Sequence, residues 1–174
     1  MDPVFVWVLR ASLAMLFATA AFHKLRAPRE FAATVEGYAL LPPSAVGPLS
    51  GALALGEVMV AAAFLMPALG VFPIAAGAAL LLVYSGAIAI NLARGRTDID
   101  CGCLGPAGRQ PLSAWLVGRN ALLIGACLLT LAPPEVRPLV WVDGLSILGG
   151  ATGMTLCWIA ANELAMLPTL RRIS

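Results

Sequence analysis

The stretch that decides the fold is residues 70–92, which read GVFPIAAGAALLLVYSGAIAINL and contain no charged side chain. A helix needs about 20 mostly apolar residues to cross the hydrocarbon core of a bilayer, and this segment is long enough. Because no water is available there to satisfy backbone N–H and C=O groups, we predict that the segment crosses as a helix. It therefore indicates an integral membrane protein.

The composition of the whole chain agrees with this assignment. Its 174 residues are 60% hydrophobic and 11% charged, and the mean hydropathy is +0.91. A soluble domain carries about 25% charged residues. The net charge is only +2, and no basic patch interleaves with aromatic residues, which excludes nucleic-acid binding as the main function.

Four further segments are long and apolar enough to cross a bilayer, which predicts an all-α, polytopic membrane bundle of about five transmembrane helices. The last segment is the weakest because Asp143 and several glycines dilute it, so a four-span alternative has it lying partly at the interface. No linker divides the chain, and we expect residues 1–174 to form a single transmembrane helical domain. The predicted spans are Val4–Phe22, Val46–Met66, Gly70–Leu92, Leu112–Leu131 and Leu139–Ala161.

The polar loop after the third span contains Cys101-Gly102-Cys103. A disulfide needs its two Cα atoms within about 4.4–6.8 Å, so a pair one residue apart requires a turn, which Gly102 permits. A ring this small is expected to be strained and easily reduced, which favours thiol–disulfide chemistry. The alternatives are a structural pair of thiols or half a metal site. Tetrahedral zinc requires four ligands, however, and the chain has no second Cys/His pair.

Cys157 and His23, inside and beside the spans, could support this chemistry. At 1.5 Å per residue, Cys157 lies about 6 Å from the membrane side that carries the loop, which makes it a candidate resolving thiol. Cys127 lies about 22 Å from that side. His23 is the only histidine, ends the first span on the loop side, and could move protons. The simpler interpretations are small buried thiols and a polar helix end.

Three charged residues fall within the predicted spans: Arg10, Glu57 and Arg119. A charge at membrane depth is costly and is normally paired, so we expect Glu57 to bond to one or both arginines and clamp helices together. The alternative is a polar cavity beneath the cysteine loop that binds a substrate or a quinone head group. A membrane quinone is accordingly one candidate electron acceptor, although the residues alone identify no cofactor.

The cations are distributed unevenly across the predicted membrane. With five spans, eight of the eleven lie on the side of the cysteine loop, which the positive-inside rule would make cytoplasmic. Stable disulfides, in contrast, form outside the cytosol. The residues alone leave the orientation open. The eight are Lys24, Arg26, Arg29, Arg94, Arg96, Arg109, Arg171 and Arg172.

The chain resembles the MauE family of methylamine-utilisation membrane proteins, which is related to DoxX-like redox-associated membrane proteins. The resemblance rests on His23-Lys24-Leu25-Arg26, Tyr38-Ala39-Leu40-Leu41-Pro42, Glu57, Asp100-Cys101-Gly102-Cys103-Leu104-Gly105 and Arg119-Asn120.

This resemblance implies a multi-pass protein of the inner (plasma) membrane that helps to mature the small subunit of methylamine dehydrogenase. That subunit is periplasmic, rich in disulfides, and carries a quinone made from two tryptophans. The resemblance also implies a thioredoxin-like, membrane-anchored partner, MauD, and assigns the redox role to Cys101 and Cys103. It places the cysteine loop on the periplasmic side, against the cation count.

Three hypotheses follow. In the first, the chain supports disulfide formation through the cysteine pair, and thiol–disulfide oxidoreductase is the candidate activity if the chain is an enzyme. In the second, it is a non-catalytic membrane scaffold for a thioredoxin-like partner. In the third, it is a small transporter of a redox-active solute, which requires a polar cavity around Arg10, Glu57 and Arg119.

Overall fold

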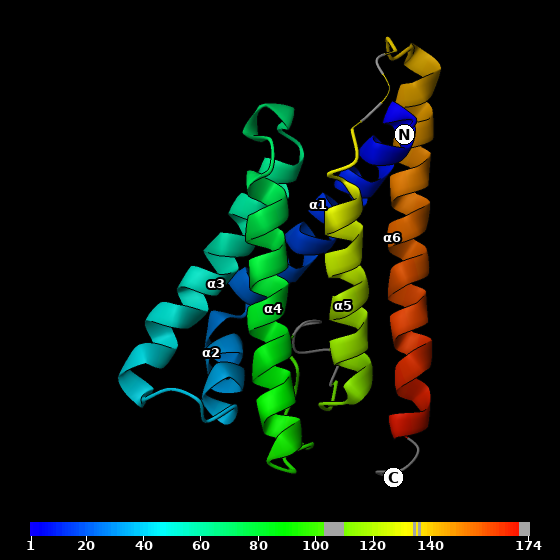
Figure 1. The fold of residues 1–174 in the computed structure, drawn as a ribbon. Helices are drawn as coiled ribbons and strands as arrows, with labels where there is room; N and C mark the ends of the chain where they lie inside the picture. Colours follow the sequence, from blue (N-terminus) through cyan, green and yellow to red (C-terminus); the bar gives the residue numbers. More distant parts are fainter. Residues whose placement is uncertain (103–109, 134, 136, 171–174) are drawn as a thin grey trace.

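The computed structural model describes residues 1–102, 110–133, 135 and 137–170, with only the backbone described for 166–170. Within these residues the chain forms six α-helices and one short 3₁₀ helix (Figure 1). This architecture confirms the predicted all-helical bundle. The helices are α1 (Pro3–Arg26), α2 (Pro28–Gly37), α3 (Pro43–Phe64), η1 (Pro67–Leu69), α4 (Phe72–Ala93), α5 (Ala114–Leu129) and α6 (Trp141–Leu170).

Local sequence explains where several helices begin. The Asp2 carboxylate accepts a hydrogen bond from the Val4 N–H at 2.8 Å and caps α1. Proline occupies the first or second position of α1, α2, α3 and α4, where its missing N–H costs nothing. At Pro28 this preference also separates α1 from α2, a short amphipathic helix that the sequence analysis did not predict.

Four helices are long and apolar enough to cross a membrane, namely α1, α3, α4 and the part of α6 from Trp141 to Ala165. The fifth apolar helix, α5, has 16 residues and is about 24 Å long, short of a core about 30 Å thick. The sequence analysis expected the last segment to be the weakest; it does have the lowest mean hydropathy of the four, 1.4, but by length it is α5 that falls short. The last helix runs along the bundle beside α1 and α5 rather than lying across its end (Figure 1).

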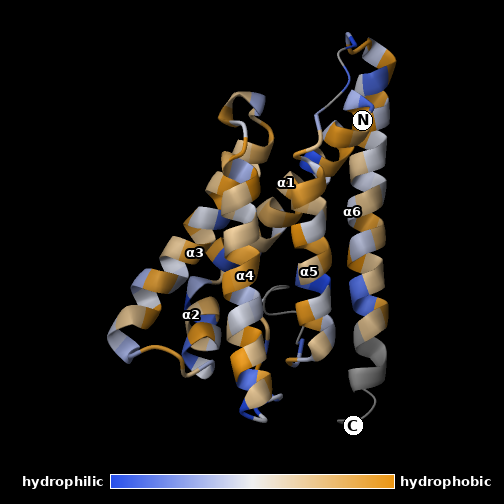
Figure 2. Cartoon of the chain, in the orientation of Figure 1, coloured by the Kyte–Doolittle hydropathy of each residue, from blue (hydrophilic) through white to orange (hydrophobic). Residues whose placement is uncertain are grey.

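The helices pack around α1, which contacts both α3 and α6, while α4 packs between α3 and α5. A central core of apolar side chains joins α1, α3, α4 and α5, with Phe17 stacked on Phe64 at a centroid distance of 6.2 Å. The outer surface of the bundle is largely hydrophobic (Figure 2). In water such a surface would promote association, so the exposed apolar side chains are those expected of helices that face lipid.

A second apolar cluster lies at the end of the bundle that carries α2 and the cysteine loop. It consists of Tyr38, Ile88, Cys101, Leu112 and Leu116. Because these residues come from α2, α4, the loop and α5, the cluster anchors the loop to three helices. We call this the cysteine-loop end, and the other, which carries the start of α1 and η1, the far end.

Candidate functional site

The cysteine loop is held by main-chain hydrogen bonds on both sides of residues 103–109. Cys101 N–H donates to the Gln110 carbonyl at 2.8 Å, and Asp100 and Pro111 form an isolated antiparallel bridge. Leu112 N–H donates to the carbonyls of Thr97 and Ile99 at 3.0 and 3.1 Å. The residues leading into the loop and those leaving it are therefore fixed side by side.

The Asp100 side chain fixes the turn at the cysteines. Its Oδ1 accepts from the N–H groups of Gly102 at 3.1 Å and Gln110 at 3.2 Å. Gly102 has a φ of +72°, which disfavours any residue with a side chain. A Cβ at Gly102 would also lie 2.9 Å from Cγ2 of Thr34 on α2. Glycine is thus required here both for its backbone conformation and for its close approach to α2.

Cys101 lies in the interior, with 8% of its surface exposed. It lines an apolar groove of about 350 Å³ between α2, α3 and α4, together with Tyr38 and Tyr84. Cys103 lies outside the described residues, so the predicted small disulfide ring stays a prediction. Cys157 is exposed on α6, and its candidate role as a resolving thiol likewise stays a prediction.

Three helices meet at a buried polar cluster in the middle of the bundle. Lys24 on α1 forms an ion pair with Glu57 Oε1 on α3 and donates to the Tyr84 hydroxyl on α4 at 3.0 Å. Tyr84 donates in turn to Glu57 Oε1 at 2.8 Å. The exposed fractions of Lys24 and Glu57 are only 4% and 1%. A buried charge pair of this kind is expensive to break because either partner alone would be stranded.

The cation beside Glu57 differs from the one that the sequence analysis expected. Arg10 donates Nε to the Phe64 carbonyl at 2.9 Å and Nη2 to the Met66 carbonyl at 3.5 Å, so it caps the last turn of α3 at the far end. Lys24 takes the predicted role because α1 continues to Arg26, beyond the predicted end at Phe22. The sequence has no turn-forming residue between Phe22 and Arg26, and this could have indicated that the helix continues. A helix four residues longer carries Lys24 into the bundle.

A second buried polar cluster joins α5 to α6. Arg119 donates Nη1 to Asn162 Oδ1 at 3.1 Å and Nη2 to Asn120 Oδ1 at 3.4 Å. Asn120 has 2% of its surface exposed, and its Nδ2 has no hydrogen-bond partner among the described residues. The sequence analysis missed Asn162, which lies after the predicted end of the last span at Ala161 and within the longer α6.

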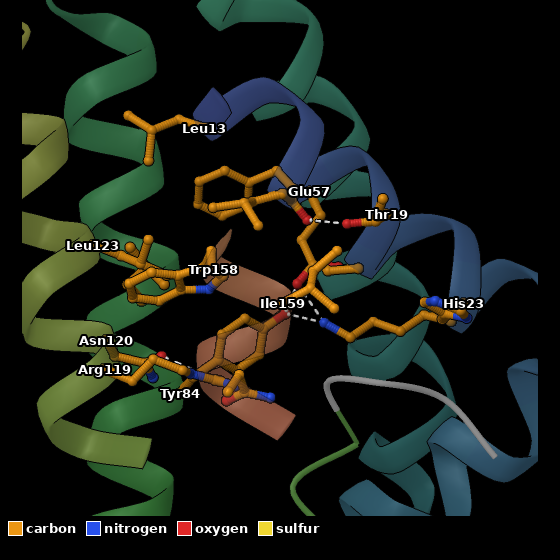
Figure 3. Close-up of a pocket in the computed structure, with 16 residues that line it drawn as sticks. Leu13, Thr19, His23, Glu57, Tyr84, Arg119, Asn120, Leu123, Trp158 and Ile159 are labelled. Atoms are coloured by element: carbon orange, nitrogen blue, oxygen red, sulfur yellow. Dashed lines mark hydrogen bonds and ion pairs between the residues drawn. The ribbon is translucent and has the colours of Figure 1, made fainter. Parts of the chain in front are cut away.

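The two clusters border one cavity of about 220 Å³ (Figure 3). Its lining includes Lys24 from α1, Glu57 from α3 and Tyr84 from α4. Arg119 and Asn120 contribute from α5. The rest of the wall is largely apolar and includes Phe17, Leu81, Leu123, Trp158 and Ile159. The cavity that the sequence analysis gave as an alternative is therefore present around Glu57 and Arg119, whereas Arg10 is not among its lining residues.

A smaller cavity of about 70 Å³ lies between this region and the cysteine loop. It is lined by Asp100 and Gly102 of the loop, by residues of α2, and by His23 and Lys24. His23 and Lys24 also line the larger cavity, so the same two side chains separate the loop from the buried polar clusters. We call the smaller cavity the vestibule and the larger one the polar cavity.

These features define a multi-pass helical membrane protein with a buried polar cavity beneath a cysteine loop. The family model for the methylamine utilisation protein MauE matches residues 2–133. The chain belongs to the MauE family. No solved structure matches it.

The curated relatives support the same assignment along nearly the whole chain. The methylamine utilization protein MauE of Paracoccus denitrificans is 39% identical over 165 residues, which cover 94% of this chain and 88% of the relative. The MauE of Paracoccus versutus is 39% identical over 171 residues, covering 96% and 90%. The MauE of Methylorubrum extorquens is 40% identical over 164 residues, covering 94% and 88%. The similarity thus extends over nearly the whole chain.

Proposed function

We propose that this methylamine-utilisation protein supports disulfide formation in the small subunit of methylamine dehydrogenase through Cys101 and Cys103. A thiolate of the client attacks the Cys101–Cys103 disulfide and forms a mixed disulfide, which a second client thiolate resolves. The client thereby loses two electrons and two protons and gains one disulfide. The loop is left with two thiols that must be reoxidised.

The observation that carries this proposal is the anchoring of the loop. A pair of cysteines that only filled space would not need a backbone fixed by Gln110, Asp100 and a glycine pressed against Thr34. The backbone leading into the cysteine pair, from Asp100 to Gly102, is thereby held in one conformation. Because Cys101 is buried, we assign the attack by the client to the sulfur of Cys103, and Cys101 is then the thiolate that leaves.

The loop is proposed to face the periplasm from the plasma membrane, where a thioredoxin-like, membrane-anchored partner such as MauD can reach it. The cation count opposes this orientation, but several of the counted cations have structural partners. Lys24 is buried against Glu57, and Arg96 donates to the carbonyls of Tyr38 at 3.2 Å and Gly37 at 2.9 Å. Their positions therefore follow from packing as well as from topology.

The test is replacement of Cys101 and Cys103 by serine, singly and together, in cells grown on methylamine. We expect the amount of mature, disulfide-bonded small subunit to fall at least tenfold in each case. Cys127→Ala is the matched control because Cys127 is a thiol of the central core at a distance from the loop in the fold. Normal maturation in the double variant would contradict the proposal. A pair that stays in one redox state in a mass-tagged maleimide assay would favour the scaffold hypothesis instead.

The transporter hypothesis is a second candidate, because the polar cavity that it requires is present around Glu57 and Arg119. It predicts that Glu57→Gln abolishes uptake of a redox-active solute without unfolding the bundle. Glutamine keeps the size of the side chain and can still accept from Lys24 and Tyr84. If Glu57→Gln cells take up thiol solutes at the normal rate, this candidate is excluded.

A further inference from the structure

The polar cavity has the chemical character of a site for a ligand that accepts hydrogen bonds. Lys24, Tyr84, Arg119 and Asn120 all contribute N–H or O–H groups to its lining. The Nδ2 of Asn120 is the most informative, since it is buried without a hydrogen-bond partner among the described residues. An unsatisfied buried donor destabilises the protein, so a ligand oxygen placed against it would be bound favourably.

The remaining walls indicate the shape and the origin of the ligand. Phe17, Leu81 and Leu123 supply apolar contacts, and Trp158 adds a flat aromatic surface. The cavity lies between the apolar helices that cross the membrane, so a ligand dissolved in the bilayer has the shortest route to it. Its volume of about 220 Å³ is below the range of about 300–1,000 Å³ for whole drug-sized ligands. It suits a ring-sized head group whose tail stays in lipid.

We propose that the polar cavity binds the head group of a membrane quinone, which reoxidises the cysteine pair. This inference rests on the proposed function, because it names the acceptor of the two electrons that disulfide formation leaves on the loop. A quinone ring is flat, apolar on its faces, and carries carbonyl oxygens that only accept hydrogen bonds. It therefore complements a cavity whose polar groups mostly donate.

The reaction balances without any other reactant. Two S–H bonds of Cys101 and Cys103 are broken and one S–S bond is formed, which releases two electrons and two protons. The quinone takes up both electrons and both protons and becomes a quinol with two O–H groups.

The position of the loop supports this assignment on two sides. Asp100 and Gly102 line the vestibule, which shares His23 and Lys24 with the polar cavity. Cys101 lines the apolar groove, which shares Tyr84 with the polar cavity. The loop thus borders the proposed quinone site through side chains that can carry protons between them.

The test measures binding of ubiquinone-1 to the full chain in lipid nanodiscs by quenching of tryptophan fluorescence, to which Trp158 contributes from the cavity wall. We expect saturable quenching in the wild type. Asn120→Leu should weaken binding by about three- to tenfold through loss of a hydrogen bond. The matched control is Leu122→Ala, because Leu122 is exposed on the same helix and should leave binding unchanged.

A photoreactive azidoquinone gives a second measurement that needs no variant. Its label should map by mass spectrometry to cavity residues of α4, α5 or α6, and excess ubiquinone-1 should remove it. Absence of saturable binding to the wild type, unchanged affinity in Asn120→Leu, or labelling that ubiquinone-1 does not displace would each overturn the quinone site. The last result would assign the cavity to ordinary lipid.

The Cys101→Ser/Cys103→Ser double variant separates this inference from the proposed function. It should bind ubiquinone-1 with wild-type affinity because Cys101 is not among the residues that line the polar cavity. If quinone binds and the double variant still matures the client, the disulfide role fails and the quinone site stands. If the double variant blocks maturation but no quinone binds, the disulfide role stands and the acceptor is different.

Discussion

The two ends of the bundle use polar residues in different ways. At the far end, Arg10 caps α3, and Arg137 pairs with Asp2 at 3.3 Å and Asp143 at 2.8 Å on the surface. These groups hold the ends of helices in place and line none of the cavities described above. Toward the cysteine-loop end, charged groups are buried and lie around two cavities that share His23 and Lys24 in their linings. Burial of charge is costly, so its concentration beneath the cysteines indicates a use other than stability.

Of the variants that test this contrast between the two ends, Lys24→Met should have the largest effect on stability. The variant strands Glu57 inside the bundle, and we expect the free energy of unfolding in mixed micelles to fall by about 3–5 kcal/mol. The double variant Lys24→Met/Glu57→Leu should recover most of that loss, since replacing both charges by apolar groups removes the stranded carboxylate. It should nevertheless fail to mature the client. If Lys24→Met alone were as stable as the wild type, the ion pair between Lys24 and Glu57 would not contribute to stability.

Gly102→Ala should have an intermediate effect, confined to the loop. The positive φ costs about 1–2 kcal/mol for a residue with a Cβ, and the Cβ meets Thr34 as well. Gly95→Ala is the matched control, because Gly95 has a φ of +70° but open space around it. We expect client maturation to be lost in Gly102→Ala and kept in Gly95→Ala. Adding Thr34→Ser, which removes Cγ2 and keeps the hydroxyl, should restore part of the maturation, whereas equal loss in both alanine variants would refute the contact with α2.

The smallest expected effect comes from Arg137→Ala at the far end. Its ion pairs with Asp2 and Asp143 raise the pKa of Arg137, yet its side chain lies on the surface, where such pairs contribute little to stability. We expect no change in the melting temperature or in client maturation beyond experimental scatter. A clear loss of maturation would mean that the far end also takes part in function and would remove the contrast between the two ends.

Much of the fold follows from local sequence. The five apolar segments predicted the five long helices to within a few residues at most ends, because hydropathy is a property of consecutive residues and needs no knowledge of neighbours. The ends were less predictable. Lys24 and Asn162 fell outside the predicted spans because polar residues lower the local hydropathy, although both lie inside helices that continue past them.

For the candidate site, the sequence identified which residues belong to the site better than it identified which residues bond to each other. Glu57, Arg119 and the cysteine loop were all expected to matter, and the structure places Glu57 and Arg119 on one cavity next to the loop. The structure pairs Glu57 with Lys24, which was not expected there, while Arg10 caps α3 instead. Depth along a helix axis is given by residue number, but the face on which a side chain lies depends on how each helix tilts and rotates against the others.

The amino-acid sequence by itself determined that this is a multi-pass membrane protein built of apolar helices, and that two cysteines lie in a polar loop between two of them. These properties depend on runs of neighbouring residues. Only the tertiary structure decided that Lys24 pairs with Glu57, that Arg119 and Asn120 face the same cavity, and that the vestibule lies between that cavity and the loop. Such relations join residues far apart in the chain, and helix packing alone brings them within bonding distance.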